Sequence, residues 1–175
     1  SGSLAGLANP TVVIGRTGKE FLIADSCAPV RDGEGNVAGA VLVFRDVTVE
    51  HARREALRQS EQRVQTVLEN LPEGILALDV ETRHVVFANA TFCRMLGYGR
   101  SELLELSLPD LHPPASMVRV QREFNKAAAG EYVFTAELPF QRRDGSAFPS
   151  HIQASKIELD SRVCVLAAVT DLTDR

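Results

Sequence analysis

The first 47 residues alternate short apolar, β-branched stretches with turns rich in glycine, asparagine and aspartate. This pattern is typical of antiparallel strands joined by hairpins. It predicts strands at residues 11–14, 21–30 and 37–47. Because three strands alone are at the margin of independent stability, we expect one face of this sheet to be covered by a missing part of the domain, by a symmetry partner or by the helix that follows.

Residues 49–70 have a different composition, rich in Arg, Glu, Gln and Ala and without Gly or Pro. This composition predicts a helix that connects two regions of strands. Thr48 is placed to act as its N-cap, and Glu50 lies in the first turn, where the helix dipole favours an acid. Pro72 follows the predicted end of the helix.

Leu57, Val64 and Leu71 recur every seven residues along this connector. A seven-residue apolar repeat favours a parallel coiled coil, so these residues are predicted to form the seam of a homodimer. The polar residues Arg53 and Ser60 occupy other seam positions. The alternative is a single amphipathic helix that lies on its own domain.

From residue 71 to residue 175 the pattern returns to strands, interrupted by one helical segment. Asn89 is well placed as the N-cap of the first helix. The predicted elements are strands at 74–78, 84–88, 132–142, 147–159 and 162–170 and helices at 90–96, from Ser101 onward and at 115–129. Two strands, a helical segment and three more strands predict an α+β fold, in which a five-stranded antiparallel sheet carries helices on one face.

Two stretches of the chain repeat one another. Arg16-Thr-Gly-Lys-Glu-Phe21 matches Arg143-Asp-Gly-Ser-Ala-Phe148 at an offset of 127 positions. The strand-end residues match at an offset of 125, and the pairs are Asp46 with Asp171 and Thr48 with Thr173. One turn between the two matches is therefore two residues shorter in the second copy.

A repeat of this length is too long for a solenoid and indicates two copies of one domain. We expect residues 1–48 to be the C-terminal strands of a truncated first copy and residues 49–70 to be the connector. Residues 71–175 are then expected to form a complete second copy.

The strings in the second copy resemble those of the PAS sensory domain family. They are Leu71-Pro-Glu-Gly74-Ile, Phe87-Ala-Asn89-Ala-Thr-Phe92, Met95-Leu-Gly97-Tyr98, Arg143-Asp-Gly145 and Val169-Thr-Asp171-Leu-Thr173. The resemblance covers residues 70–175 in full, and residues 4–48 resemble the last three strands of a preceding PAS domain. Each string alone is weak, but five in this order are specific to the family.

The PAS resemblance implies ligand sensing, protein association or passive signal relay. We expect the sensory and signal-relay region of a bacterial signalling protein, a sensor histidine kinase, that binds a small ligand or relays its state through a dimeric connector. The alternative is a ligand-free PAS dimerisation module of a diguanylate cyclase or a transcription regulator. In either case an output domain is the expected partner in the full-length protein.

The strand ends are the expected signal-transfer residues: Asp46 and Thr48 lead into the connector, and Asp171 and Thr173 would lead into the next segment. An aspartate at such a point can cap a helix or pair with a basic residue, and so fix the exit angle of the chain. The sequence has no nucleophile motif and no phosphate-binding glycine loop, so no catalytic residue is expected in this chain.

No cofactor and no metal site are expected. The light-sensing flavin proteins of the family carry a reactive cysteine in a stretch that reads here Leu106-Ser-Leu-Pro-Asp-Leu-His112, without cysteine. PAS haem sensors place a histidine on the longer helix, and residues 115–129 contain none. His112 is expected to be a solvated loop histidine, and His151 is expected to point away from the helices.

An unknown small ligand remains possible in a pocket between sheet and helices. The candidate lining residues are Phe92, Met95, Leu111, Met117, Phe124, Ile152 and Leu166. The alternative is that all of them belong to a closed hydrophobic core.

Composition narrows the partners and the compartment. A net charge of −4 gives no basic surface for nucleic acid, and no apolar stretch approaches the roughly 18 residues that span a bilayer, so no membrane contact is expected. Cys27, Cys93 and Cys164 are dispersed without metal-ligand spacing. This favours three reduced cysteines in a cytoplasmic protein.

Overall fold

The computed structural model of the chain describes residues 5–6 and 11–173, with the backbone alone for residues 134–136. The chain forms two compact units. Their boundary in the sequence falls within helix α1 (Thr48–Asn70), between Arg63 and Val64. Helix α1 confirms the predicted connector helix, and none of its residues is buried.

The first unit contains an antiparallel sheet centred on β3. Its strands are β1 (Ala5–Gly6), β2 (Thr11–Ile14), β3 (Glu20–Arg31) and β4 (Val37–Asp46). Both β2 and β4 pair with β3, as predicted, and the two-residue β1 is an addition to the prediction. Side chains alternate between the faces of a strand, and Val41, Leu42, Val43 and Phe44 are each at least half exposed, so both faces of β4 present apolar surface.

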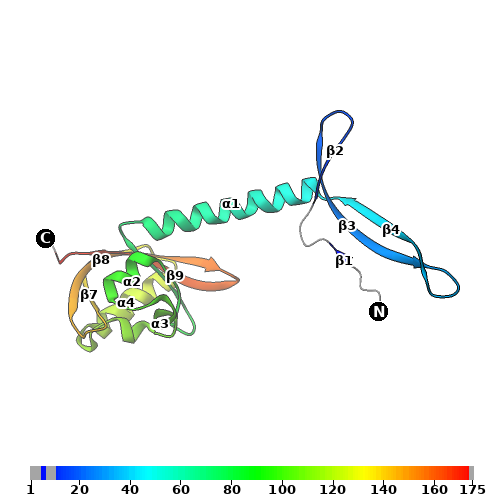
Figure 1. The fold of residues 1–175 in the computed structure, drawn as a ribbon. Helices are drawn as coiled ribbons and strands as arrows, with labels where there is room; N and C mark the ends of the chain where they lie inside the picture. Colours follow the sequence, from blue (N-terminus) through cyan, green and yellow to red (C-terminus); the bar gives the residue numbers. More distant parts are fainter. Residues whose placement is uncertain (1–4, 7–10, 174–175) are drawn as a thin grey trace. The chain divides into compact units, whose positions relative to one another are not determined.

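The second unit contains a five-stranded antiparallel sheet in the order β6-β5-β9-β8-β7. Figure 1 shows β7, β8 and β9 of this sheet together with helices α2, α3 and α4. The strands are β5 (Gly74–Asp79), β6 (Val85–Ala88), β7 (Val133–Gln141), β8 (Ala147–Leu159) and β9 (Arg162–Asp171). The helices are α2 (Ala90–Leu96), α3 (Arg100–Leu104), η1 (Leu108–Leu111), η2 (Pro114–Ser116) and α4 (Met117–Ala128), and they pack against one face of the sheet. The predicted α+β fold is confirmed.

The core of the second unit lies between this sheet and these helices. Phe92 of α2 meets the ring of Phe140 edge-on at a centroid distance of 5.5 Å, and the rings of Phe140 and Phe148, which are cross-strand neighbours, stack at 6.0 Å. Each such fully buried side chain contributes roughly 1.5–3 kcal/mol to stability. Gly74 lets α2 approach β5, since a Cβ there would lie 2.9 Å from the Phe92 ring and from the sulfur of Met95.

Two predictions at element ends were wrong. The Thr48 hydroxyl does not cap α1, because it accepts a hydrogen bond from the backbone N–H of Leu22 at 2.8 Å. Helix α3 begins at Arg100, before Ser101, and the backbone N–H of Gly99 donates to the Glu102 carboxylate at 2.7 Å. Helix α1 ends at Asn70, as predicted, and the dimer seam of Leu57, Val64 and Leu71 stays a prediction.

Candidate sensory site

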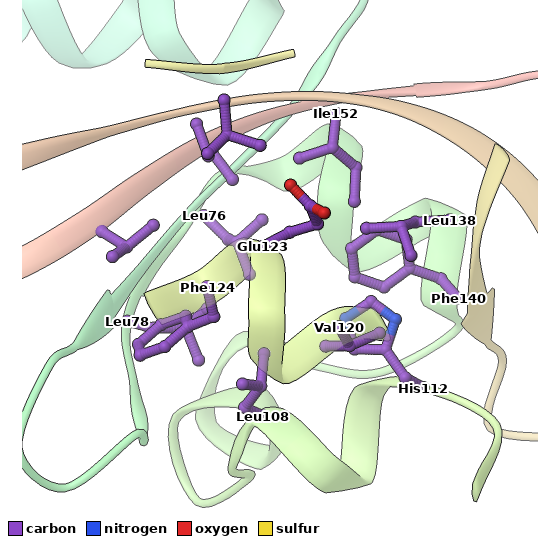
Figure 2. A pocket seen from close by; sticks show the side chains of 14 residues that line it. Leu76, Leu78, Leu108, His112, Val120, Glu123, Phe124, Leu138, Phe140 and Ile152 are labelled. Carbon is purple, nitrogen blue, oxygen red and sulfur yellow. The ribbon is translucent and has the colours of Figure 1, made fainter. Parts of the chain in front are cut away.

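A cavity of about 50 Å³ lies within the second unit, between the sheet and helix α4 (Figure 2). The sheet supplies its apolar wall, from Leu76, Leu78, Val133, Leu138, Phe140, Ile152, Ala154, Val165 and Ala167. The helical side supplies Leu108, His112, Val120, Glu123 and Phe124. The lining is therefore apolar except for one imidazole and one carboxylate.

Two of the seven candidate pocket residues, Phe124 and Ile152, line this cavity. Phe92 and Leu111 are fully buried in the core instead, and Met95 and Met117 pack against that core. These four side chains therefore lie outside the lining of this cavity and stabilise the domain as part of its core or packed against it.

Leu166 also lies outside the lining of this cavity. It lies between the lining residues Val165 and Ala167 on β9, so its side chain belongs to the opposite face of the strand. The strand reads as an unbroken apolar run, and such a run does not reveal which face is inward.

His112 was wrongly expected to be solvated. The residue is 3% exposed, and its ring lies 4.3 Å from the ring of Phe140. Nδ1 lies 2.7 Å from the backbone oxygen of Pro139. Burial lowers the pKa of His112 to about 4, so the ring is neutral at pH 7. The only sequence signal for this burial was its position between Leu111 and Pro113.

The tautomer of His112 follows from this contact. A carbonyl oxygen only accepts hydrogen bonds, so Nδ1 carries the proton and donates it to Pro139. In a neutral ring the other nitrogen, Nε2, is then an acceptor. The cavity is therefore bordered by an uncharged imidazole with its lone pair on Nε2.

Glu123 of α4 supplies the second polar group of the cavity. Its side chain is 13% exposed and forms ion pairs with Arg122 at 3.1 Å and Lys126 at 3.5 Å. Burial raises the pKa of the carboxyl group, but the contacts with Arg122 and Lys126 outweigh this effect and leave it below its ordinary value. Glu123 is thus ionised at pH 7, and sequence reasoning did not select it.

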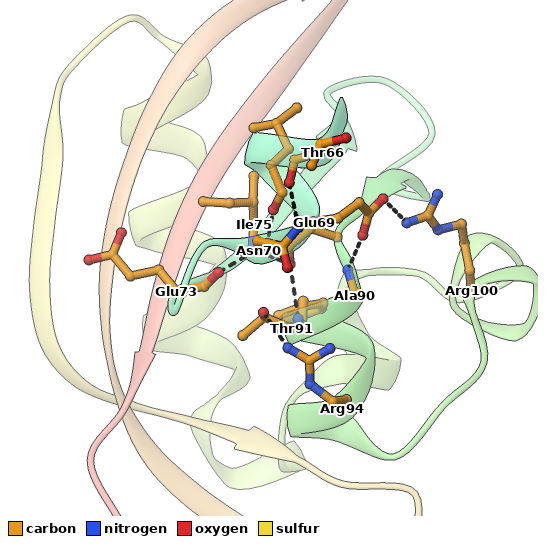
Figure 3. A network of polar contacts seen from close by, with 12 residues as sticks. Thr66, Glu69, Asn70, Glu73, Ile75, Ala90, Thr91, Arg94 and Arg100 are labelled. Carbon is orange, nitrogen blue, oxygen red and sulfur yellow. Dashed lines mark hydrogen bonds and ion pairs between the residues drawn. The ribbon is translucent and has the colours of Figure 1, made fainter. Parts of the chain in front are cut away.

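A polar network joins the end of helix α1 to the start of helix α2, and Figure 3 shows Glu69, Ala90 and Arg100 within it. Asn89 connects helix α2, strand β5 and the end of helix α1. Its side-chain oxygen accepts from the backbone N–H groups of Phe92 and Ile75, both at 2.9 Å. Its amide donates to the backbone oxygens of Leu68 at 2.8 Å and Glu73 at 3.1 Å. The predicted N-cap is confirmed, and the same fully buried side chain also holds the last turn of the connector helix.

Two further contacts fasten the connector to the start of α2. The Glu69 carboxylate accepts from the backbone N–H of Ala90 at 2.6 Å and forms an ion pair with Arg100. The hydrogen bond from Arg100 lowers the pKa of Glu69 despite its partial burial. Thr91 donates its hydroxyl to the backbone oxygen of Leu71 at 2.7 Å. The N-terminus of α2 is therefore bonded to the last turn of α1 and to the residue that follows it.

The other end of α2 is bonded to the end of the last strand. Arg142 donates to the backbone oxygen of Met95 and to the Asp171 carboxylate, the latter at 2.8 Å. The guanidinium also lies 4.1 Å from the centre of the Phe148 ring. Asp171 accepts from the backbone N–H of Thr173 at 2.8 Å.

The charge of Asp171 is stabilised by these partners. Partial burial raises the pKa of Asp171, but the hydrogen bonds from Thr173 and Arg142 lower it by a larger amount, so the net shift is downward. The chain exit is thus a charged aspartate fixed to α2 through one arginine.

Other chemistry is limited in the part of the chain that the structure describes. Residues 5–6 and 11–173 contain no group of three or more His, Cys, Asp or Glu that could hold a metal ion. The three cysteines form no disulfide. No helix among these residues is both long enough and apolar enough to cross a membrane.

Comparison with protein families matches residues 62–172 to the PAS fold and residues 6–49 to a second model described as a PAS domain. The first match covers more than half of the chain, so the chain belongs to the PAS family. The two matches also fit the two copies predicted from the internal repeat.

Two relatives of the chain are sensory signalling proteins. The sensor histidine kinase TmoS of Ectopseudomonas mendocina is 28% identical over 142 residues, which are 78% of this chain and 14% of that protein. A methyl sulfide methyltransferase-associated sensor of Methanosarcina acetivorans is 24% identical over 139 residues, 74% of this chain and 13% of that protein. The chain therefore spans about a seventh of the length of these relatives.

Among solved structures, the PAS domain of an HTR-like protein from Haloarcula marismortui aligns with a TM-score of 0.62 and 25% identity. The alignment covers 70% of this chain and 99% of that domain. A domain of a sensory box sensor histidine kinase/response regulator from Geobacter sulfurreducens aligns with a TM-score of 0.53 over 64% of this chain and 95% of that domain, at 20% identity. The fold and the relatives together indicate a role in sensory signalling.

Proposed function

We propose that the chain is the sensory and signal-relay region of a bacterial sensor histidine kinase, located in the cytoplasm. In this proposal the second PAS domain binds a small ligand in the cavity beside α4. Helix α2 then transmits the state of the domain to helix α1 at one end and to the end of strand β9 at the other. The chain senses and relays, while catalysis belongs to a separate output domain. The relatives named above support the kinase class, and three unpaired cysteines suit a reducing compartment.

The observation that carries the proposal is the double attachment of α2. Asn89 and Glu69 bond its N-terminus to the connector, and Arg142 bonds its last turn to Asp171. Between these ends, Phe92 contacts Phe140, whose ring lines the cavity. A change in the cavity wall that shifts α2 would act on the entry and the exit of the domain together, as a relay between two states requires.

The proposed relay works through a homodimer of connector helices. Leu57 and Val64 are 61% and 58% exposed on α1, and Val67 beside them is 57% exposed. Their spacing fits a two-helix seam, and burying each side chain against a second copy would contribute roughly 1.5–3 kcal/mol. Replacing both Leu57 and Val64 with Asp should convert a dimer into a monomer in light scattering, and a wild-type monomer at high micromolar concentration would contradict this part of the proposal.

The relay itself is tested with Asn89→Ser in the full-length protein. Serine still accepts at the helix N-cap, but its single O–H on a shorter side chain cannot replace the two bonds that the amide donates to Leu68 and Glu73, so the connector loses the Asn89 part of its attachment to α2. We expect the autophosphorylation rate to change several-fold. Asn125→Ser, on the exposed face of α4, is the matched control and should leave the rate unchanged. A normal rate in a folded Asn89→Ser protein would overturn the proposal.

A further inference from the structure

Both polar groups that border the cavity are hydrogen-bond acceptors. Nε2 of His112 is an acceptor because Nδ1 donates to Pro139, and the carboxylate of Glu123 only accepts when ionised. Figure 2 shows both side chains on the cavity wall, with apolar side chains around them. An occupant that satisfies this wall must therefore bring a hydrogen-bond donor.

The two acceptors are not equally available. Glu123 already has two cationic partners, Arg122 and Lys126, at 3.1 and 3.5 Å. Only 3% of the His112 surface is exposed. Nε2 lies on the side of the ring away from Nδ1, the nitrogen that donates to Pro139. A buried acceptor gains most from a new partner, since leaving it without one costs free energy.

The volume of the cavity limits the size of the occupant. A water molecule needs about 10–15 Å³, whereas a dry cavity of about 150 Å³ accepts benzene. At about 50 Å³ this cavity suits a molecule of only a few non-hydrogen atoms.

We propose that the cavity binds a small, uncharged, mainly apolar molecule that carries a hydroxyl group, which donates its hydrogen bond to Nε2 of His112. This inference rests on the proposed sensory function and adds the chemical class of the ligand.

Charged molecules of the same size fit this wall less well. A carboxylate would turn its acceptor oxygens toward Nε2 of His112 and would lie near the negative charge of Glu123. An ammonium group would have to leave water for an apolar lining, and the carboxylate that would balance it is already paired with Arg122 and Lys126.

The class is tested by titrating the full chain with 1-propanol, propionate and propylammonium, which share one carbon skeleton. Methyl NMR signals of Leu76, Leu108 and Ile152 report directly on the cavity wall. We expect saturable shifts with 1-propanol and at least about tenfold weaker binding of both ions. Equal or tighter binding of either ion, or no saturable binding of 1-propanol, would overturn the inference.

The role of His112 is tested with His112→Phe, which keeps a ring and removes the acceptor. We expect at least about tenfold weaker binding of 1-propanol, the equivalent of one hydrogen bond. His84→Phe, at an exposed histidine of the same domain, should bind as wild type does. Unchanged affinity in His112→Phe would overturn the inference.

A second measurement does not depend on the folding of the variant. In the wild-type chain the ¹⁵N signal of Nε2 should move on addition of 1-propanol, and a stationary signal at saturation would contradict the proposed bond. If 1-propanol does not bind while Asn89→Ser still changes autophosphorylation, the ligand class is wrong and the proposed relay stands.

Discussion

The two Asp-x-Thr strand ends, at residues 46–48 and 171–173, have the same backbone hydrogen bonds but differ in their side-chain contacts. In each copy the central residue donates its N–H to the preceding strand, to Leu22 at 2.8 Å and to Pro149 at 3.0 Å. In each copy the aspartate also accepts from the backbone N–H of the threonine, at 2.9 and 2.8 Å. The repeat in the sequence is therefore a repeat of backbone structure.

The threonine hydroxyls differ because of one residue. In the first copy, Thr48 accepts a hydrogen bond from the backbone N–H of Leu22. The equivalent residue of the second copy is Pro149, which has no N–H to donate. The hydroxyl of Thr173 donates to the carboxylate of Asp171, and the hydroxyl of Thr48 is likewise hydrogen-bonded to Asp46, so the two differ in the bond that Thr48 accepts from Leu22.

The aspartates differ because of another residue. Arg142 bonds Asp171 to the last turn of α2, and the position that matches Arg142 in the first copy is Gly15. The two strand ends have the same backbone structure, but only in the second copy does an arginine, Arg142, connect the aspartate to a helix, α2. Two copies of one domain with the same backbone structure can thus differ in their side-chain contacts because of substitutions at a few positions.

The largest expected effect is that of Asp171→Asn, which keeps the backbone contact with Thr173 but removes the charge that Arg142 pairs with. Breaking a partly buried, charge-assisted pair should cost about 1–2 kcal/mol of unfolding free energy in urea titrations. Asp46→Asn is the matched variant in the first copy, and its loss should be smaller because, among the described residues, the Asp46 carboxylate is hydrogen-bonded to Thr48 and not to an arginine. An equal loss in both variants would remove the distinction between the two strand ends.

The loss of stability in Asp171→Asn should depend on pH. The pKa of Asp171 is lowered in the folded chain, so its charge stabilises the fold above the unfolded pKa of about 3.9, and this stabilisation is lost as the pH falls through the folded pKa. The difference in stability between wild type and Asp171→Asn should therefore shrink below about pH 4. A constant difference down to pH 3 would show that the charge of Asp171 does not matter.

A smaller effect should separate the two threonines. Thr48→Ala leaves the N–H of Leu22 without its side-chain acceptor, at a cost of about 1 kcal/mol, and should speed hydrogen exchange at that amide about fivefold. Thr173→Ala frees no backbone amide of the preceding strand, because Pro149 has none. Unchanged exchange at Leu22 in the Thr48→Ala chain would show that this hydrogen bond contributes nothing.

The smallest effect on stability is expected for Pro149→Leu, which makes the second copy resemble the first. The new backbone N–H should bond to the hydroxyl of Thr173, so the stability should change by no more than about 0.5 kcal/mol. The slowed exchange of that amide is the measurement that checks the contact. Fast exchange would mean that the new N–H is not bonded to the hydroxyl of Thr173 and that proline alone does not explain the difference.

Much of the fold could be predicted from the sequence, because its signals are local. Strand patterns, turns and the N-cap at Asn89 each depend on a few adjacent residues, and the internal repeat and the PAS strings set their order. The inward face of β9 could not be read from an unbroken apolar run, so Leu166 was assigned to the wrong side.

The candidate site was harder to predict because it depends on contacts between distant parts of the chain. Arg142 and Asp171 are 29 residues apart, and Glu69 and Arg100 are 31 apart. No periodicity brings such charges together, since their pairing follows from tertiary packing. The burial of His112 against β7 has the same origin.

The central claim is that α2 couples the entry and the exit of the second PAS domain. A double-mutant cycle with Glu69→Gln and Asp171→Asn measures this coupling directly, because each variant weakens one end of α2. We predict that the two losses of unfolding free energy differ from additivity by at least about 0.5 kcal/mol, while the control pair of Glu55→Gln and Asp171→Asn is additive. Additivity of the Glu69 and Asp171 variants within about 0.3 kcal/mol would contradict the claim.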